Sequence, residues 1–212
     1  GNTLKYVSRG GLKLEKAMEN FDVTIEGKIC MDVGSSTGGF TDCALQNKAK
    51  RVYAVDVGTN QLVWKLRNDS RVVVKEKTNF RHATTDLFEY ELPNIATIDV
   101  SFISLKLIFE PLKDILNDGD DIVALIKPQF EAGREDVGKK GIVKDAKIHQ
   151  RVIENVISYA NECQFSIQNL TYSPITGGEG NIEFLAHFKV GGTNSLLQVE
   201  QVVQEAHDCF KG

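Results

Sequence analysis

Short apolar runs alternate along this chain with segments of helical periodicity, and this alternation constrains the fold more than any other feature. Runs rich in β-branched residues predict strands over residues 28–33, 51–56, 72–75, 95–100 and 121–126. Helical patterns predict helices over 10–20, 37–46, 60–66, 105–116, 145–160 and 195–210. Strands that alternate with helices are typical of a parallel sheet covered by helices.

The direction of the last two strands follows from the length of their connection. Apolar runs at 165–172 and 182–190 are joined only by residues 173–181, which is too short for a crossover helix, so these strands are expected to pair antiparallel. The run at 121–126 is apolar on both faces, as in a central parallel strand. The sequence therefore predicts an α/β fold: a Rossmann-like methyltransferase sheet, mostly parallel, with an antiparallel C-terminal hairpin strand and helices on both faces.

Size and composition predict the setting of this fold. With 212 residues the chain is expected to form a single domain, 1–212, on which the N-terminal lead-in segment 1–27 packs with its helix. The four cysteines lack metal-site spacing and are expected to be free thiols in a reducing compartment. Neither a signal peptide nor an apolar run of about 18 residues is present, so a cytoplasmic protein without membrane contact is expected.

A glycine-rich turn, GSSTGG at residues 34–39, lies between the first strand and the following helix. Such a turn lets a ligand approach the backbone and the free N–H groups of the helix N-terminus. Asp56 ends the next strand, where carboxylates bind ribose hydroxyls. Asp32 would order the turn and meet a cationic cofactor, whereas it would repel a pyrophosphate. This pattern favours S-adenosylmethionine, while a nicotinamide dinucleotide or a tight turn without ligand remains an alternative. The predicted cofactor-binding residues are Asp32, Gly34, Ser35, Ser36, Thr37, Gly38, Gly39, Phe40, Asp56, Val57, Asn79 and Asp99.

Four charged residues interrupt or end elements that should be apolar: Lys13, Asp99, Lys127 and Glu183. Asp99 and Lys127 follow strands of the expected parallel sheet, and ligands bind beyond the carboxyl ends of such strands. Glu183 lies at the start of an antiparallel strand and so reaches the same edge. Each residue alone could be a surface or paired charge, but together they indicate a catalytic site.

Five segments of the chain resemble the TlyA family, often labelled haemolysin A, whose members are FtsJ-like RNA ribose methyltransferases. The segments are 6–14, 32–41, 99–104, 127–131 and 177–184, and they follow the family's order over nearly the whole chain. The resemblance implies a Lys-Asp-Lys-Glu tetrad at Lys13, Asp99, Lys127 and Glu183. It also implies 2′-O-methylation of cytidine in ribosomal RNA, with S-adenosylmethionine as donor and ribosomal RNA or ribosomal subunits as partner.

TlyA proteins usually begin with a small S4-type RNA-binding domain, whereas only seven residues precede Ser8 here. The chain is therefore expected to be the catalytic part, with an S4-type domain sharing the grip on RNA. A net charge of −4 fits this expectation, because an RNA-binding domain acting alone should be basic. Clusters of basic residues near 75–82 and 139–144 form either a local RNA-binding rim or a solvated face.

In the mechanism that we expect, Lys127 is the general base that takes the proton of the ribose hydroxyl. Desolvation and the like charge of Lys13 would favour the neutral lysine, Asp99 would orient Lys127 and the amino-acid end of the cofactor, and Glu183 would fix Lys13 or the ribose. A membrane-active haemolysin and an NAD-linked oxidoreductase are the alternatives.

Overall fold

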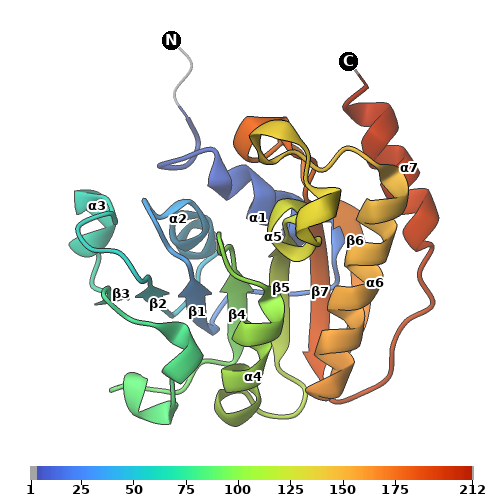
Figure 1. The fold of residues 1–212 in the computed structure, drawn as a ribbon. Helices are drawn as coiled ribbons and strands as arrows, with labels where there is room; N and C mark the ends of the chain where they lie inside the picture. Colours follow the sequence, from blue (N-terminus) through green and yellow to red (C-terminus); the bar gives the residue numbers. More distant parts are fainter. Residues whose placement is uncertain (1–3, 212) are drawn as a thin grey trace.

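A seven-stranded sheet forms the centre of the computed structural model, which describes residues 4–211 (Figure 1). Its order is β3-β2-β1-β4-β5-β7-β6. The strands are β1 (Ile29–Val33), β2 (Arg51–Val55), β3 (Val72–Lys75), β4 (Ile95–Ile98), β5 (Asp121–Ile126), β6 (Phe165–Tyr172) and β7 (Phe184–Val190). All pairs from β3 to β5 are parallel, whereas β7 runs antiparallel to both β5 and β6. The Rossmann-like sheet with an antiparallel hairpin is therefore confirmed.

The helices lie close to the ranges that the periodicity predicts. They are α1 (Gly10–Asn20), α2 (Gly39–Gln46), α3 (Trp64–Arg67), α4 (Leu105–Ile115), α5 (Pro128–Glu131), α6 (Ala146–Glu162) and α7 (Val199–Cys209). Short 3₁₀ turns are η1 (Phe80–His82), η2 (Thr85–Leu87), η3 (Arg134–Asp136), η4 (Lys139–Gly141) and η5 (Gly178–Gly180). The first three residues of the predicted lead-in segment 1–27 lie outside the described residues.

Four of the predicted helices begin later than expected: α6 by one residue, α7 by four, and α2 and α3 for backbone reasons. The helix predicted from residue 37 begins at Gly39 because Gly38 has a left-handed φ of 113°. The helix predicted over 60–66 is reduced to Trp64–Arg67, because Asn60 has a φ of 56° and Val63 is extended. The strand predicted from residue 182 begins at Phe184, so Glu183 lies just before β7.

Helices cover both faces of the sheet, as predicted. On one face, α1, α2 and α3 pack against one set of strand side chains, which includes Cys30, Val52 and Leu125. On the other face, α4, α6 and α7 pack against the alternate set, which includes Met31, Val55 and Ile126. Because successive side chains of a strand point to opposite faces, one apolar strand supplies both layers of the core.

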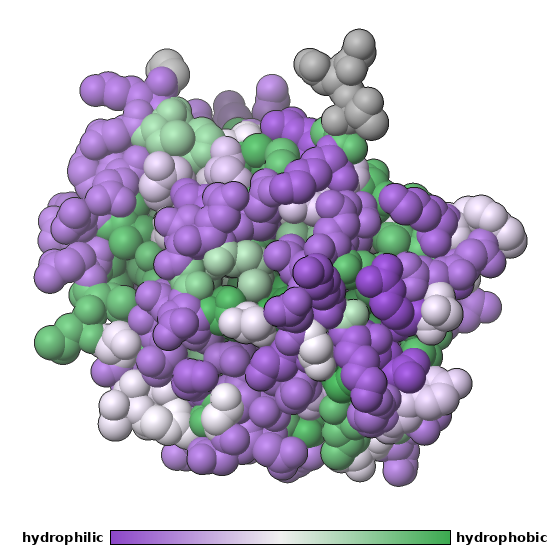
Figure 2. All heavy atoms as spheres, turned by 180° about the vertical axis from the view of Figure 1, so that it is seen from behind, coloured by the Kyte–Doolittle hydropathy of each residue, from purple (hydrophilic) through white to green (hydrophobic). Residues whose placement is uncertain are grey.

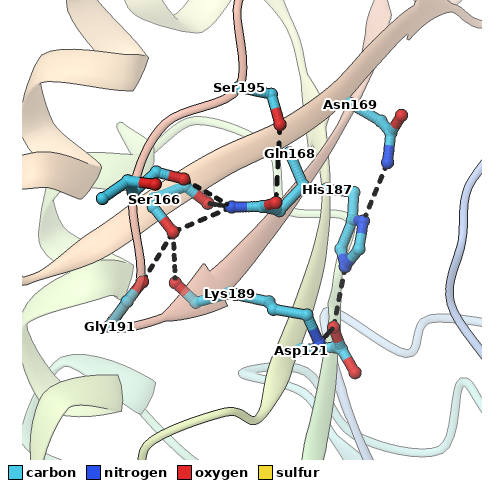
Figure 3. A network of polar contacts seen from close by, with 9 residues as sticks. Asp121, Ser166, Gln168, Asn169, His187, Lys189, Gly191 and Ser195 are labelled. Atoms are coloured by element: carbon cyan, nitrogen blue, oxygen red, sulfur yellow. Dashed lines mark hydrogen bonds and ion pairs between the residues drawn. The ribbon is translucent and has the colours of Figure 1, made fainter.

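A polar network fixes β7 between its two neighbours (Figure 3). The ring of His187 in β7 is 2.8 Å from Asp121 Oδ1 at the start of β5, and its other nitrogen is 3.2 Å from the side-chain nitrogen of Asn169 in β6. Burial opposes ionisation of Asp121, but hydrogen bonds from His187 and Lys189 hold its pKa below the ordinary value. The network specifies the register of the antiparallel strands, since a shifted register would leave these buried groups unpaired.

Polar residues cover most of the face shown in Figure 2, and apolar residues form scattered patches among them. Within residues 4–211, no helix has both the length and the apolar character needed to cross a bilayer.

Candidate functional site

The turn after β1 brings backbone from three strands together. Gly34 has a φ of 87°, and a Cβ at this position would lie 2.1 Å from the carbonyl oxygen of Asp99. The N–H groups of Gly34 and Ser35 both donate to the carbonyl of Val55, at 2.8 and 3.0 Å. Glycine is required here because only a residue without a side chain fits both the left-handed backbone and the close approach.

Asp56 ties this turn to the loop after β2. One of its carboxylate oxygens accepts from the N–H of Ser36 at 2.7 Å, and the other accepts from the N–H of Gly58 at 2.8 Å. The predicted residue at the end of the second strand therefore shapes the turn as well as lining the site.

Two adjoining hollows lie at the carboxyl edge of the parallel strands. The larger, of about 530 Å³, is lined by six predicted cofactor residues: Gly34, Ser36, Asp56, Val57, Asn79 and Asp99. The smaller, of about 100 Å³, lies at the N-terminus of α2 and adds Ser35, Thr37, Gly39 and Phe40. Ten of the twelve predicted residues thus line one or both hollows.

Asp32 and Gly38 line neither hollow. Asp32 is fully buried, and its carboxylate accepts hydrogen bonds from the hydroxyls of Thr41 at 2.6 Å and Thr97 at 3.5 Å. Burial raises the pKa of Asp32 to about 7, partly offset by the bond from Thr41. Its side chain points from β1 toward α2, because it shares the face of Cys30 and not that of Met31 and Val33. Asp32 thus holds α2 against the sheet.

The four predicted catalytic residues form two ion pairs. Lys127 follows β5, and its Nζ lies 2.6 Å from Oδ1 of Asp99, which follows β4. Lys13 of α1 lies 3.0 Å from Oε1 of Glu183, which precedes β7. The Lys13–Glu183 pair is almost completely buried, with the Glu183 side chain 1% exposed. Each lysine has its own carboxylate, so the charge of Lys13 is compensated locally and does not act on Lys127 as an isolated like charge.

Two polar residues that the sequence analysis did not single out complete the site. Ser101 Oγ accepts a hydrogen bond from Lys127 at 3.1 Å. Gln129 donates to Oε2 of Glu183 at 3.0 Å and, two residues after Lys127, links the two ion pairs. Both lie within segments that carry the family resemblance, which is the signal that could have identified them.

The site can hold a nucleoside with a charged amino-acid tail. Ser35 Oγ is buried and lacks a hydrogen-bond partner among the described residues, and Ser35 lines the smaller hollow. A buried unpaired hydroxyl beside a helix N-terminus suits a ligand carboxylate, because both offer hydrogen-bond donors to an anion. Within residues 4–211, no cluster of side chains suited to a metal ion is present.

Comparison with known proteins places this geometry in a family. The family model of FtsJ-like methyltransferases matches residues 6–190. The chain is 58% identical to YqxC of Bacillus subtilis, a presumed rRNA methyltransferase, over all of this chain and 77% of that protein. It is 41% identical to the 16S/23S rRNA (cytidine-2′-O)-methyltransferase TlyA of Mycobacterium tuberculosis, over 84% of this chain and 66% of that protein.

A solved structure is also closely similar. It is that of a presumed hemolysin from Streptococcus thermophilus, at 56% identity and a TM-score of 0.96, covering all of this chain and 78% of that one.

Proposed function

Because this chain belongs to the FtsJ-like methyltransferase family, we propose that it transfers the methyl group of S-adenosylmethionine to a ribose 2′-hydroxyl in ribosomal RNA. The observation that carries the proposal is the Lys127–Asp99 pair at 2.6 Å, because Asp99 lines both hollows. A lysine placed beside the cofactor site suits proton removal from a hydroxyl, which ribose methylation requires and hydride transfer to a nicotinamide does not.

The cofactor binds across the two hollows. Asp56, Val57 and Asn79 line the larger hollow and would hold the nucleoside part. Ser35 and the first N–H groups of α2 bind the carboxylate of the amino-acid part, and Asp99 faces its ammonium group. S-adenosylmethionine supplies the activated methyl group, and the residues of the chain hold it in line with the hydroxyl.

Lys127 is the general base of the Lys-Asp-Lys-Glu tetrad. Nζ of Lys127 takes the proton of the 2′-hydroxyl, and the carboxylate of Asp99 stabilises the ammonium that forms. Ser101 accepts a hydrogen bond from the same Nζ and so directs its remaining protons. Alignment of the hydroxyl with the methyl group contributes much of the acceleration.

Lys13 and Glu183 position the ribose. Their buried pair is rigid because Glu183 is bonded on both oxygens, by Lys13 and by Gln129. The target nucleotide is cytidine, by analogy with the TlyA relative. Phe102, whose side chain is 88% exposed at the edge of the larger hollow, offers an aromatic face to an unstacked base.

The RNA is held jointly with an S4-type domain outside this sequence. The chain carries a net charge of −4, so local basic residues such as Arg81 at the rim of the larger hollow supply only part of the contact with phosphates.

The deciding experiment incubates ribosomal subunits with S-adenosylmethionine labelled in the methyl group, with and without an upstream S4-type domain. We expect label in ribosomal RNA, recovered as 2′-O-methylcytidine after digestion to nucleosides. Label in protein, or in a base rather than a ribose, would contradict the proposal.

A further inference from the structure

Glu131 ends the segment that begins with Lys127, and the mechanism above leaves its carboxylate without a role. Its side chain contacts the end of the loop 99–104 and the start of α4. Oε1 accepts a hydrogen bond from the hydroxyl of Ser104 at 2.6 Å, and Oε2 accepts from the N–H of Leu105 at 2.9 Å. Both oxygens are therefore engaged by the start of α4.

These two contacts stabilise a partly buried carboxylate at a helix N-terminus. Burial raises the pKa of Glu131, and the bonds from Ser104 and Leu105 oppose that rise. Leu105 is the first residue of α4, and Ser104 caps the helix by accepting from the N–H of Lys106 at 3.1 Å. Free N–H groups at this end of a helix favour a negative charge.

The loop that Glu131 holds, residues 99–104, carries two groups of the catalytic site. Asp99 and Ser101 both contact Lys127. Between them and Ser104 lies Phe102, which has a left-handed φ of 63° and packs on Phe130 with ring centroids 4.8 Å apart. The loop and α5 therefore meet at three places: at Lys127, at the two aromatic rings and at Glu131.

The two ends of the loop are fixed differently. At its start, the N–H of Asp99 donates to the carbonyl of Val33 at 3.0 Å, which ties the loop to β1. At its end, Glu131 connects Ser104 to α5, the helix that follows Lys127 directly. A left-handed backbone at a phenylalanine is strained and persists only where the surroundings hold it. The contacts of Glu131 with Ser104 and Leu105 lie two and three residues after Phe102.

We propose that Glu131 is a positioning residue whose carboxylate holds the loop 99–104 against α5, so that Asp99 and Ser101 stay aligned with Lys127. This inference rests on the proposed role of Lys127 as the base. It assigns to Glu131 a part in turnover rather than in cofactor binding, because Glu131 lines neither hollow and Asp99, the loop residue that faces the cofactor, is held independently by β1.

The test replaces Glu131 by Gln, which keeps the shape of the side chain and leaves one acceptor oxygen. We expect kcat to fall by roughly ten- to a hundredfold, the range that small misalignments produce. The Kd for S-adenosylmethionine should stay within about threefold, far less than that fall, because Asp99 is held by β1. Glu135→Gln is the matched control, since Glu135 is exposed in the 3₁₀ turn η3 that follows α5, and it should keep full kcat.

Ser104→Ala removes one of the two contacts by a separate change and provides a second variant if Glu131→Gln folds poorly. Ser104→Ala should also lower kcat. The fold decrease in kcat of the double variant should be smaller than the product of the fold decreases of the two single variants, because both changes remove the same contact. If Glu131→Gln folds and keeps full kcat, with only a lower Tm, then Glu131 only stabilises the start of α4 and the inference is overturned. Lys127→Ala is assayed in parallel: if it keeps near-wild-type turnover, the assignment of Lys127 as the base fails, whereas an inactive Lys127→Ala beside a fully active Glu131→Gln refutes the positioning role alone.

Discussion

At the scale of single residues, the site consists of two ion pairs whose partners lie far apart in the sequence. Lys127 and Asp99 follow neighbouring strands, so the parallel register of β4 and β5 explains their contact. Lys13 and Glu183 are 170 positions apart, and only the packing of α1 beside β7 brings them together.

Replacement of Lys127 by Ala tests the base directly. We expect turnover to fall by about 10²–10⁴-fold, the usual contribution of a general base. Cofactor affinity should be nearly unchanged, because Lys127 lines neither hollow. Single-turnover label transfer and calorimetric titration measure the two effects. Lys106→Ala, at an exposed lysine of α4, is the control. Near-wild-type turnover in Lys127→Ala would require another base.

Asp32 makes stability depend on pH in a defined direction. Because its pKa is raised to about 7 by burial, the folded state binds a proton that an unfolded Asp releases near pH 4. Its contribution to the free energy of unfolding should therefore fall as pH rises from about 4 to 7 and stay low above that.

Asp32→Asn should remove this dependence. The variant should be more stable than the parent at pH 8, and the gain should vanish toward pH 4, as measured by urea unfolding at both values. Thr41 can still donate to the amide oxygen, so the contact with α2 is retained. An equal effect at both pH values would mean that Asp32 is ionised throughout.

At the scale of elements, the ranges of strands and helices followed from the sequence with small errors, because apolar periodicity reflects which side chains are buried. Two of the errors lie where the backbone decides: Gly38 delays α2, and the left-handed Asn60 shortens α3. The packing of α1 against the sheet could not be predicted from the sequence, since a helix that carries Lys13 and Lys16 is expected to be partly exposed to solvent. In the structure Lys13 is buried against Glu183, and Lys16 donates to the backbone carbonyl of Tyr172.

Variants of the Lys13–Glu183 pair should show that its effect on stability can be reversed while its effect on methyl transfer remains. Glu183→Gln leaves a buried ammonium without a counter-ion and should destabilise the fold by about 3–5 kcal/mol. Adding Lys13→Met should restore much of that stability without restoring methyl transfer. Chemical unfolding and label transfer on the single and double variants measure both quantities. A double variant as active as the parent would show that the pair is only structural.

At the scale of the whole molecule, the acidic balance limits how this chain holds RNA. Lys75, in the predicted basic rim, is paired with Glu89 at 2.6 Å and so contributes less than its charge suggests. We therefore expect an S4-type domain joined to the N-terminal side to lower the KM for ribosomal subunits and to leave kcat nearly unchanged. It should also steepen the dependence of KM on salt, because more phosphates are contacted. If the KM and its dependence on salt are the same with and without the domain, the two domains do not bind the RNA jointly.

The sequence by itself determined the Rossmann-like sheet, its antiparallel end and the edge at which the chemistry lies, because strand periodicity, connection length and parallel topology are local or nearly local properties. Ten of the twelve residues that it predicts for cofactor binding line the two hollows, since the residues that end parallel strands and the turns after them meet at one edge of the sheet. Tertiary structure alone decided the partners: that Asp32 is buried beneath the turn, that Lys13 meets Glu183, and that Glu131 reaches the start of α4. Hydrogen bonds and ion pairs form over about 3 Å, and a strand or helix displaced by a single residue would break the contacts that its own side chains make.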